Sequence, residues 1–178
     1  MNKDRIYRTY LNTAINLNKK ILELILNVSK SSIEEELLFS IIVIEKMNRG
    51  HFSNYILEKC LSLLAPSILI NYNASIGLCQ ICVKTARKVV NLPEETIVRK
   101  LMLPEYNIDI MLKLIELYSY ESTSDKSNLR KTIINLHTTG KKNASPNIYL
   151  DMYHELVNWS IKNRCFSKIY LSPNYSPT

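Results

Sequence analysis

The stretch Leu37-Leu-Phe-Ser-Ile-Ile-Val-Ile44 is apolar at every position except Ser40. A helix that is apolar nearly all round is buried on all sides. The stretch therefore predicts a central buried helix from Ile33 to about Met47. Glu34–Glu36 would stand in its first turn, after a serine cap at position 31 or 32, where carboxylates complement the helix dipole. The Asn-Arg-Gly sequence that finishes at Gly50 predicts its end.

Apolar residues at helical spacing predict further helices on both sides of this segment. The expected helices cover residues 4–28, 52–64, 78–90, 94–102, 108–120 and 148–164, with a shorter one at 129–136. Only 3 Gly and 6 Pro occur in 178 residues, too few for the tight turns of a sandwich or barrel. The sequence thus predicts an all-α fold, built as one main domain over residues 31–168. Residues 1–30 are expected to add an N-terminal helix, and residues 169–178 a tail.

The charge balance indicates an anionic partner. Lys and Arg number 23 and Asp and Glu 16, for a net charge of +7, which suits nucleic acid, an anionic membrane or the bacterial wall. Lys84, Arg87 and Lys88 share an expected helix, but basic residues are spread along the chain among acids. That distribution lacks a recognition-helix pattern and disfavours nucleic acid. No signal peptide is expected, and the longest apolar runs fall short of the roughly 20 residues of a membrane span.

The four cysteines predict neither a metal site nor a redox centre. Cys79 and Cys82 form a CxxC pair, but a zinc site needs about four ligands and no second pair follows. A redox CxxC would stand at the start of a helix that follows a strand, and the sequence does not predict that context here. The pair is interpreted as small apolar side chains on a helix. We expect no metal and no organic cofactor.

Glu45 and the segment around Gly77 are the candidate functional positions. Glu45 closes the apolar helix, so partial desolvation would favour its protonated form, and a protonated carboxyl group is what glycosidic cleavage needs. The alternative is a surface glutamate paired with Lys46 or Arg49. Gly77 allows a close backbone approach, and the nearby Gln80 could bind sugar hydroxyls or amides. The alternative there is a loop-to-helix junction with a solvated Gln80, capped by Ser75.

Four short motifs together resemble one family. Ser75-x-Gly-Leu-x-Gln-Ile81, followed by Thr85-Ala86, resembles a signature of the lysozyme-like lytic transglycosylases. Leu103-Pro-Glu-Tyr-Asn-Ile108 resembles the segment that opens that family's next long helix. Ile134-Asn-Leu-His-Thr-Thr-Gly140 stands at the position of the family's Tyr-Asn-x-Gly motif. Ile44-Glu-Lys-Met-Asn-Arg49 resembles a variant of its catalytic helix. The motifs occur in the family's order, and the resemblance covers residues 37 to about 153.

The resemblance implies a lysozyme-like fold and a set of site residues. Glu45 would be the sole catalytic acid and base. Ser75 and Gln80 would line the cleft near the cleaved bond, and Asn107 would shape the helix that walls it. His137 stands where the family has a sugar-contacting tyrosine, so it is a substituted position.

Glu58 is the alternative acid. Gln80 lies 35 residues after Glu45, longer than usual in the family, and 22 residues after Glu58. Glu45 is preferred because it closes the buried helix and begins the Asn-Arg-Gly turn. Glu58 could instead support the site, for example by holding Arg49.

The implied substrate is the β-1,4 bond between N-acetylmuramic acid and N-acetylglucosamine in peptidoglycan glycan strands. In a lytic transglycosylase Glu45 protonates the leaving oxygen and then acts as base while the muramyl 6-hydroxyl closes a 1,6-anhydro ring. A hydrolytic muramidase would need a second carboxylate or a positioned water. Glu58, Glu105 and Asp109 have no compelling position for that role, and the choice stays open.

The implied place of action is the bacterial cell wall or periplasm. A wall-cleaving protein without a signal peptide would be a phage lysis protein, an exported antibacterial effector or a part of a secretion machine. Its protein partners would then be an immunity protein or a secretion-system carrier. The competing hypothesis is a non-catalytic helical protein that binds nucleic acid or another protein, including a lysozyme-like fold that has lost its activity.

Overall fold

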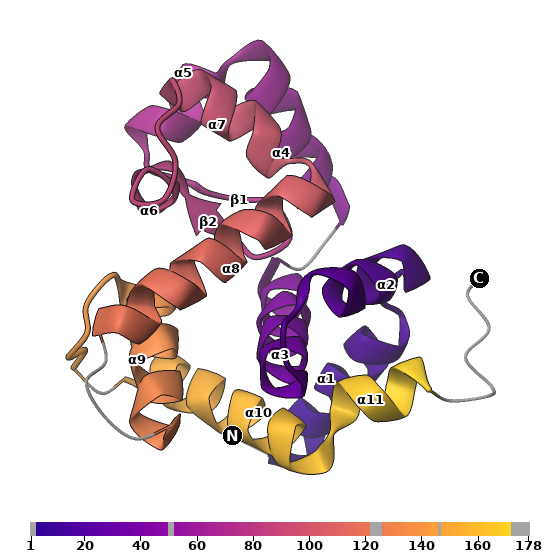
Figure 1. Cartoon of the computed structure of the whole chain (residues 1–178). Helices are drawn as coiled ribbons and strands as arrows, with labels where there is room; N and C mark the ends of the chain where they lie inside the picture. Colours follow the sequence, from indigo (N-terminus) through magenta and orange to yellow (C-terminus); the bar gives the residue numbers. More distant parts are fainter. Residues whose placement is uncertain (1–2, 50–51, 122–125, 146, 172–178) are drawn as a thin grey trace. The chain divides into compact units, whose positions relative to one another are not determined.

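The computed structural model describes residues 3–49, 52–121, 126–145 and 147–171, and these are mostly helical (Figure 1). The predicted all-α class is confirmed. The helices are α1 (Lys3–Ile15), α2 (Lys19–Val28), α3 (Ser32–Arg49), α4 (Phe52–Leu64), α5 (Pro66–Asn71), α6 (Val83–Ala86), α7 (Glu94–Leu101), α8 (Pro104–Glu121), α9 (Lys126–Thr139), α10 (Ile148–Asn163) and α11 (Cys165–Tyr170). Two short strands, β1 (Ser75–Ile76) and β2 (Ile81–Cys82), pair antiparallel.

The chain forms two compact units. The first unit joins Met1–Gly50 to Glu155–Thr178, and the second unit is His51–His154. The domain boundaries expected from the sequence, at 31–168 with flanking segments, stay predictions. None of the helices in the described parts is both long enough and apolar enough to cross a membrane.

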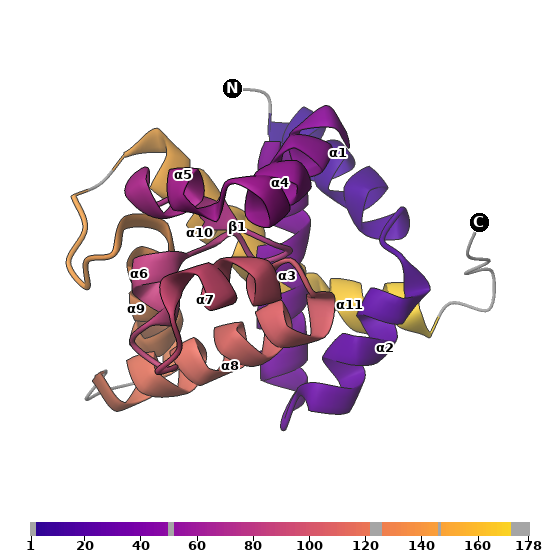
Figure 2. The same cartoon turned by 90° about the horizontal axis from the view of Figure 1, so that it is seen from above.

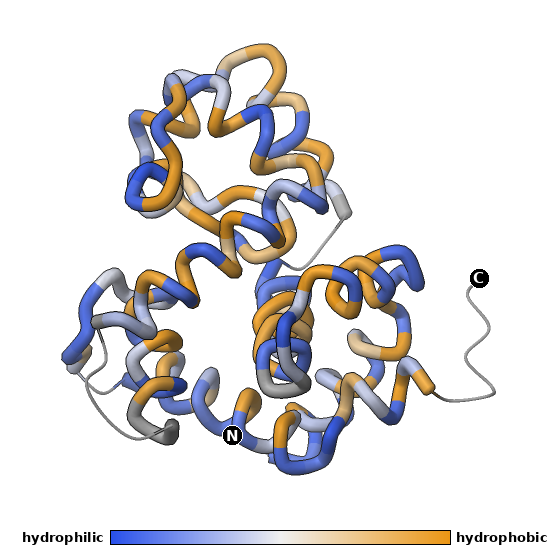
Figure 3. Tube along the Cα trace, viewed as in Figure 1, coloured by the Kyte–Doolittle hydropathy of each residue, from blue (hydrophilic) through white to orange (hydrophobic). Residues whose placement is uncertain are grey.

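The first unit is built around α3. Every residue from Leu37 to Ile44 is at most 3% exposed, and the helix is coloured as strongly apolar in Figure 3. Helices α1, α2 and α11 pack against it, as Figures 1 and 2 both show. The predicted buried central helix is therefore confirmed.

The start of α3 is capped by its own side chains. The Ser31 hydroxyl oxygen accepts the N–H of Glu34 at 3.3 Å, and the Glu34 carboxylate accepts the N–H of Lys30 at 2.7 Å. This reciprocal pair satisfies backbone donors that have no partner within the helix. Ser31 is thus one of the two predicted caps. Gly50, predicted to terminate the helix, lies outside the described residues.

The prediction of one helix over 4–28 is wrong, because the chain breaks between α1 and α2. Asn18 takes an extended backbone conformation there, and its side-chain oxygen accepts the N–H of Lys20 at 2.8 Å. The Asn16 side chain donates to the carbonyl of Asn12 at 2.8 Å. Asparagine side chains compete with helical hydrogen bonds in this way. The apolar spacing carried on through the break, so periodicity alone did not detect it.

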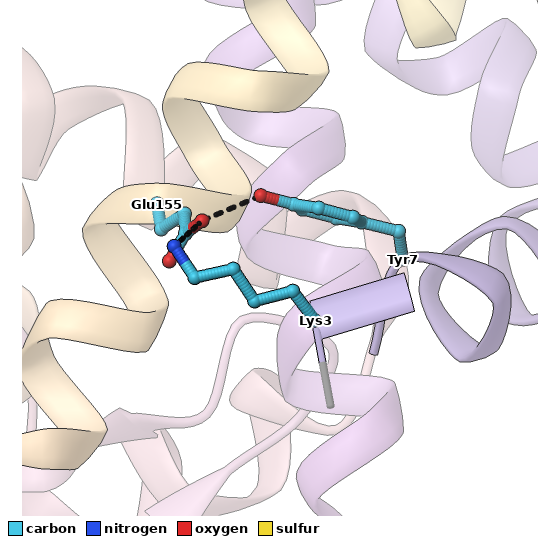
Figure 4. A network of polar contacts seen from close by, with 3 residues as sticks. All are labelled: Lys3, Tyr7 and Glu155. Atoms are coloured by element: carbon cyan, nitrogen blue, oxygen red, sulfur yellow. Dashed lines mark hydrogen bonds and ion pairs between the residues drawn. The ribbon is translucent and has the colours of Figure 1, made fainter. Parts of the chain in front are cut away.

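A polar cluster attaches α1 to α10 within the first unit (Figure 4). The Glu155 carboxylate accepts hydrogen bonds from Lys3 Nζ at 2.8 Å and from the Tyr7 hydroxyl at 2.6 Å. The Tyr7 ring stacks on Trp159 with ring centroids 4.7 Å apart. Deeper in the unit, the buried Tyr10 hydroxyl donates to the Ser160 hydroxyl at 2.9 Å. These contacts give the N-terminal segment a defined place on the first unit.

In the second unit α7 packs against α4, α5 and α6, and α8 packs against α7 and α9. Helix α4 has the predicted bounds, 52–64. Pro66 follows it as predicted, and it also begins α5, because proline suits the first turn of a helix. The short helix predicted at 129–136 is the longer α9.

The prediction of a helix over 78–90 is wrong. The chain instead forms the β1–β2 hairpin and the four-residue α6. Gly77 has a φ of 77° and Gln80 a φ of 48°, and a right-handed helix cannot contain these conformations. The Cys79 side chain is buried in the turn of the hairpin rather than on a helix, and Cys82 lies on β2.

Candidate functional site

The candidate site is centred on the β1–β2 hairpin of the second unit. Ser75 pairs with Cys82 and Ile76 with Ile81. The turn between them is closed by the N–H of Gln80, which donates to the carbonyl of Gly77 at 3.1 Å. The Gln80 side-chain nitrogen donates to the same carbonyl at 2.9 Å. The side-chain oxygen of Gln80 is thereby left as the group that can accept a hydrogen bond from a ligand.

Asn107, near the start of α8, fixes the hairpin from the inside. Its side-chain oxygen accepts the N–H of Cys79 at 2.8 Å. Its side-chain nitrogen donates to the carbonyls of Ile76 at 3.0 Å and Leu101 at 2.9 Å. The residue is fully buried, so all three bonds are protected from water. Asn107 therefore joins the hairpin to the end of α7 and the start of α8.

Gly77 is required by both conformation and space. Its φ of 77° is a left-handed conformation that L side chains rarely adopt. A Cβ at this position would also collide with the Asn107 side-chain nitrogen and with the Leu101 carbonyl oxygen. Because Gly77 has no Cβ, the backbone of the hairpin can lie in close contact with the Asn107 side-chain amide.

Glu58, on α4, also binds the hairpin. Its carboxylate accepts the N–H of Gly77 at 2.6 Å, a short, charge-assisted hydrogen bond. The structure thus brings together Glu58, Gly77, Gln80 and Asn107, from three separate segments of sequence. In this arrangement the Glu58 carboxylate is engaged with the backbone.

Ser75 lies on β1 of the hairpin, whereas His137 lies outside it, on α9. The Ser75 side chain is exposed, and its hydroxyl lies 3.4 Å from the Cys82 sulfur. His137 lies near the end of α9, half-buried, with its ring edge-to-face on Tyr153 at 6.0 Å between centroids.

Glu45 and Arg49 lie in the last two turns of α3, in the first unit. The Glu45 side chain is 8% exposed, so it is not a surface glutamate. The neighbouring Lys46 donates through Nζ to the carbonyl of Asn16 at 2.8 Å. Burial lowers the pKa of Lys46.

The sequence did not predict a second polar cluster in the second unit. The side chain of Asn135 is buried, and its nitrogen donates to the carbonyl of Lys142 at 2.8 Å while its oxygen lies 2.9 Å from His154 Nε2. Since an amide oxygen only accepts, the histidine donates here. Burial lowers the pKa of His154, and Lys131 acts in the same direction. Asn135 belongs to the third motif, but only the His137 position was singled out there.

The other acids considered for hydrolysis are on α8 and have ordinary surroundings. Asp109 forms a 2.8 Å ion pair with Lys113, one turn along the helix. Glu105 is exposed in the first turn. Within the described ranges, no three His, Cys, Asp or Glu side chains gather in a way that could hold a metal ion.

The basic residues expected on one helix do not share one. Only Lys84 lies on α6, because the helix ends at Ala86. Arg87 forms a 2.7 Å ion pair with Glu94, and the Lys88 ammonium lies 5.6 Å from the centroid of the Tyr118 ring. Two of the three charges are thus engaged within the chain.

Comparisons of this chain with protein-family models, with curated proteins and with solved structures gave no match.

Proposed function

We propose that this protein is a lysozyme-like glycosidase that cleaves the β-1,4 bond between N-acetylmuramic acid and N-acetylglucosamine in peptidoglycan, as a lytic transglycosylase with one catalytic glutamate. The observation that carries the proposal is the Asn107 connection. Ser75–Ile81 and Leu103–Ile108 are separate parts of the resemblance, and the Asn107 amide bonds directly to the hairpin that the first part forms. Thr85-Ala86, which completes the signature, lies on α6 directly after that hairpin.

Proximity of this kind supports the resemblance because the sequence does not require it. The two motifs are separated by α6 and α7, and two chance matches would have no reason to share buried hydrogen bonds. The pattern's glycine and asparagine also have a physical need for each other. Gly77 provides the space that the Asn107 side chain fills, so these two motif residues are explained by one structure.

Glu45 is the proposed acid and base. Its carboxyl group is buried near the end of α3, and in this proposal it is the proton donor that glycosidic cleavage requires. It gives that proton to the glycosidic oxygen as the bond to the muramyl C1 breaks. The resulting carboxylate then takes the proton of the muramyl 6-hydroxyl, whose oxygen bonds to C1 and closes the 1,6-anhydro ring. No water is consumed, and no second carboxylate is needed.

The remaining residues have supporting roles in this proposal. Gln80 and Ser75 bind sugar hydroxyl or acetamido groups, Gln80 through its side-chain oxygen. His137 is proposed as a further sugar contact. Asn107 and Glu58 are positioning residues that hold the hairpin through Cys79 and Gly77. Arg49 shares the last turns of α3 with the acid.

The net charge of +7 would concentrate the protein on an anionic wall, an attraction that salt weakens. In that setting the proposed place of action is the cell wall or periplasm. An immunity protein or a secretion-system carrier is the proposed partner.

The test is digestion of isolated peptidoglycan sacculi by the full-length protein, with mass spectrometry of the released fragments. The proposal expects muropeptides that end in 1,6-anhydro-N-acetylmuramic acid. Fragments with reducing ends would show that the protein is a hydrolase and not a transglycosylase. Sacculi that release nothing, at several pH values and salt concentrations, would contradict the proposed activity.

A further inference from the structure

Helix α4 differs from an ordinary surface helix because several of its apolar side chains are exposed. Its polar residues Glu58 and Ser62 face the protein: Glu58 bonds to Gly77, and Ser62 is 1% exposed. Five of its apolar residues are exposed, among them Leu57 at 59% and Leu64 at 85%, whereas Tyr55 and Leu61 are half-buried. A surface helix normally shows the reverse arrangement.

The outward residues form one continuous stripe. At about 100° per residue, five apolar side chains of α4 fall within roughly one third of the helix circumference, which they share with Ser53: Ile56, Leu57, Cys60, Leu63 and Leu64. We call this set the α4 stripe. All five are exposed. Ile56 and Leu63 are seven residues apart, as are Leu57 and Leu64, which is the spacing of a helix that packs along another helix.

The next helix extends the apolar character. Helix α5 packs against α4. Ile68 on α5 is 42% exposed, and Tyr72, which directly follows the helix, is 83% exposed. Figure 3 shows the largely apolar colouring of this part of the chain. With roughly 150–200 Å² for a large side chain when fully exposed, these residues present on the order of 500–700 Å² of apolar surface.

We propose that the α4 stripe packs against the same stripe of a second copy of this chain, forming a twofold dimer. The charge pattern carries the choice of partner. From Cys60 to Val83 the sequence contains no charged residue, and on α4 only Glu58 and Lys59 are charged. Glu58 is turned inward. The stripe can therefore meet its own copy without bringing like charges together, as an isologous interface requires.

The area also matches a dimer. A standard interface buries about 800 Å² on each partner, of which a little over half is apolar. The surface of α4 and α5 can supply that apolar share. A membrane fits less well, since interfacial helices combine an apolar face with several basic residues, and Lys59 is the one basic residue of α4.

Sedimentation velocity of the full chain, over a wide range of protein concentrations, tests the proposal. The wild type should form a dimer, and Leu64→Glu or Leu57→Glu should raise its dissociation constant about tenfold or more, because a carboxylate would be buried in an apolar contact. Ile148→Glu is the matched control, at an apolar residue that is 80% exposed on α10, and it should leave the dimer intact. Circular dichroism checks that each variant keeps its helix content.

Cys60 provides a second measurement that needs no charged substitution. It lies within the stripe, so a short bismaleimide should link two copies, and Cys60→Ser should abolish the link while Cys82→Ser keeps it. A wild type that stays monomeric at every concentration would overturn the proposal. It would also be overturned by a dimer that both Leu57→Glu and Leu64→Glu leave unchanged. A monomer that binds vesicles of anionic lipid would assign the stripe to a membrane instead. The readout is the oligomeric state, so the result is independent of whether the protein cleaves peptidoglycan.

Discussion

Asn107 is the residue on which the hairpin depends most. Its buried amide, near the start of α8, makes three hydrogen bonds, to β1, to the turn of the hairpin and to the end of α7. If this side-chain amide is removed, the buried backbone groups that it binds lose their hydrogen-bond partner, and water cannot reach them to replace it. The Asn107 side chain therefore stabilises the conformation of the hairpin in the candidate site.

Replacing Asn107 by alanine should lower the free energy of unfolding by about 3 kcal/mol, since one change leaves three buried backbone groups unsatisfied. Urea unfolding followed by circular dichroism would measure it. The control is Asn91→Ala, at an exposed asparagine, which should change stability by less than about 0.5 kcal/mol. Equal effects of the two substitutions would show that the Asn107 bonds contribute little.

Gly77→Ala and Gly140→Ala form a matched pair. Both glycines have a positive φ, 77° and 71°, so each alanine costs about 1–2 kcal/mol of backbone strain. A Cβ at Gly140 meets open space, whereas at Gly77 it collides with Asn107 and Leu101. The Gly77 variant should therefore lose about 1–3 kcal/mol more than the Gly140 variant. Similar midpoints of thermal unfolding would contradict this description of the turn.

At the level of elements, the sequence predicted helices well where a local signal decides them. The central helix α3 was correct because its run from Leu37 to Ile44 is apolar and buried, and the end of α4 was correct because Pro66 follows it. Prediction failed where a single polar side chain overrides the apolar spacing. Asn18 breaks α1 from α2, and Asn107 holds a hairpin where the spacing indicated a helix. No local pattern reveals a partner that lies 28 residues away.

Helix α11 depends on a carboxylate from another element. Glu36, on α3, is 5% exposed and accepts the N–H groups of Phe166 at 3.1 Å and Ser167 at 3.4 Å. Carboxylates favour this position because the first N–H groups of a helix lack internal partners. Burial raises the pKa of Glu36, and the hydrogen bonds from Phe166 and Ser167 offset part of that rise.

The raised pKa of Glu36 predicts how the stability of the protein changes with pH. The folded protein binds this proton more tightly than the unfolded chain does. The stability that Glu36 contributes is therefore fully present below its ordinary pKa of 4.5, and it is lost as the pH rises through the raised value. Glu36→Gln removes this titration, so the stability of the variant relative to wild type should increase from acidic to neutral pH. Thermal unfolding of both proteins across that range would show it, and a constant difference would contradict it.

At the scale of the whole molecule, composition was enough to predict the all-α class. It was not enough to predict the candidate site. The resemblance singled out Ser75, Gln80, Asn107 and His137 by their order in the sequence. The structure places Ser75 and Gln80 in one hairpin, bonds Asn107 to that hairpin, and places His137 on α9. Glu58 was predicted as an alternative acid, and in the structure its carboxylate accepts the N–H of Gly77. Contacts of this kind depend on tertiary structure, which sequence spacing does not encode.

The central claim is that Glu45 is the acid of a peptidoglycan-cleaving enzyme, and a comparison of Glu45→Gln with Glu58→Gln on isolated sacculi tests it most directly. Release of soluble muropeptides should fall by at least about 10²-fold in Glu45→Gln, since the proton donor is lost. It should be largely kept in Glu58→Gln, because glutamine can still accept the N–H of Gly77. Full activity in Glu45→Gln, or loss of activity in a folded Glu58→Gln alone, would contradict the assignment.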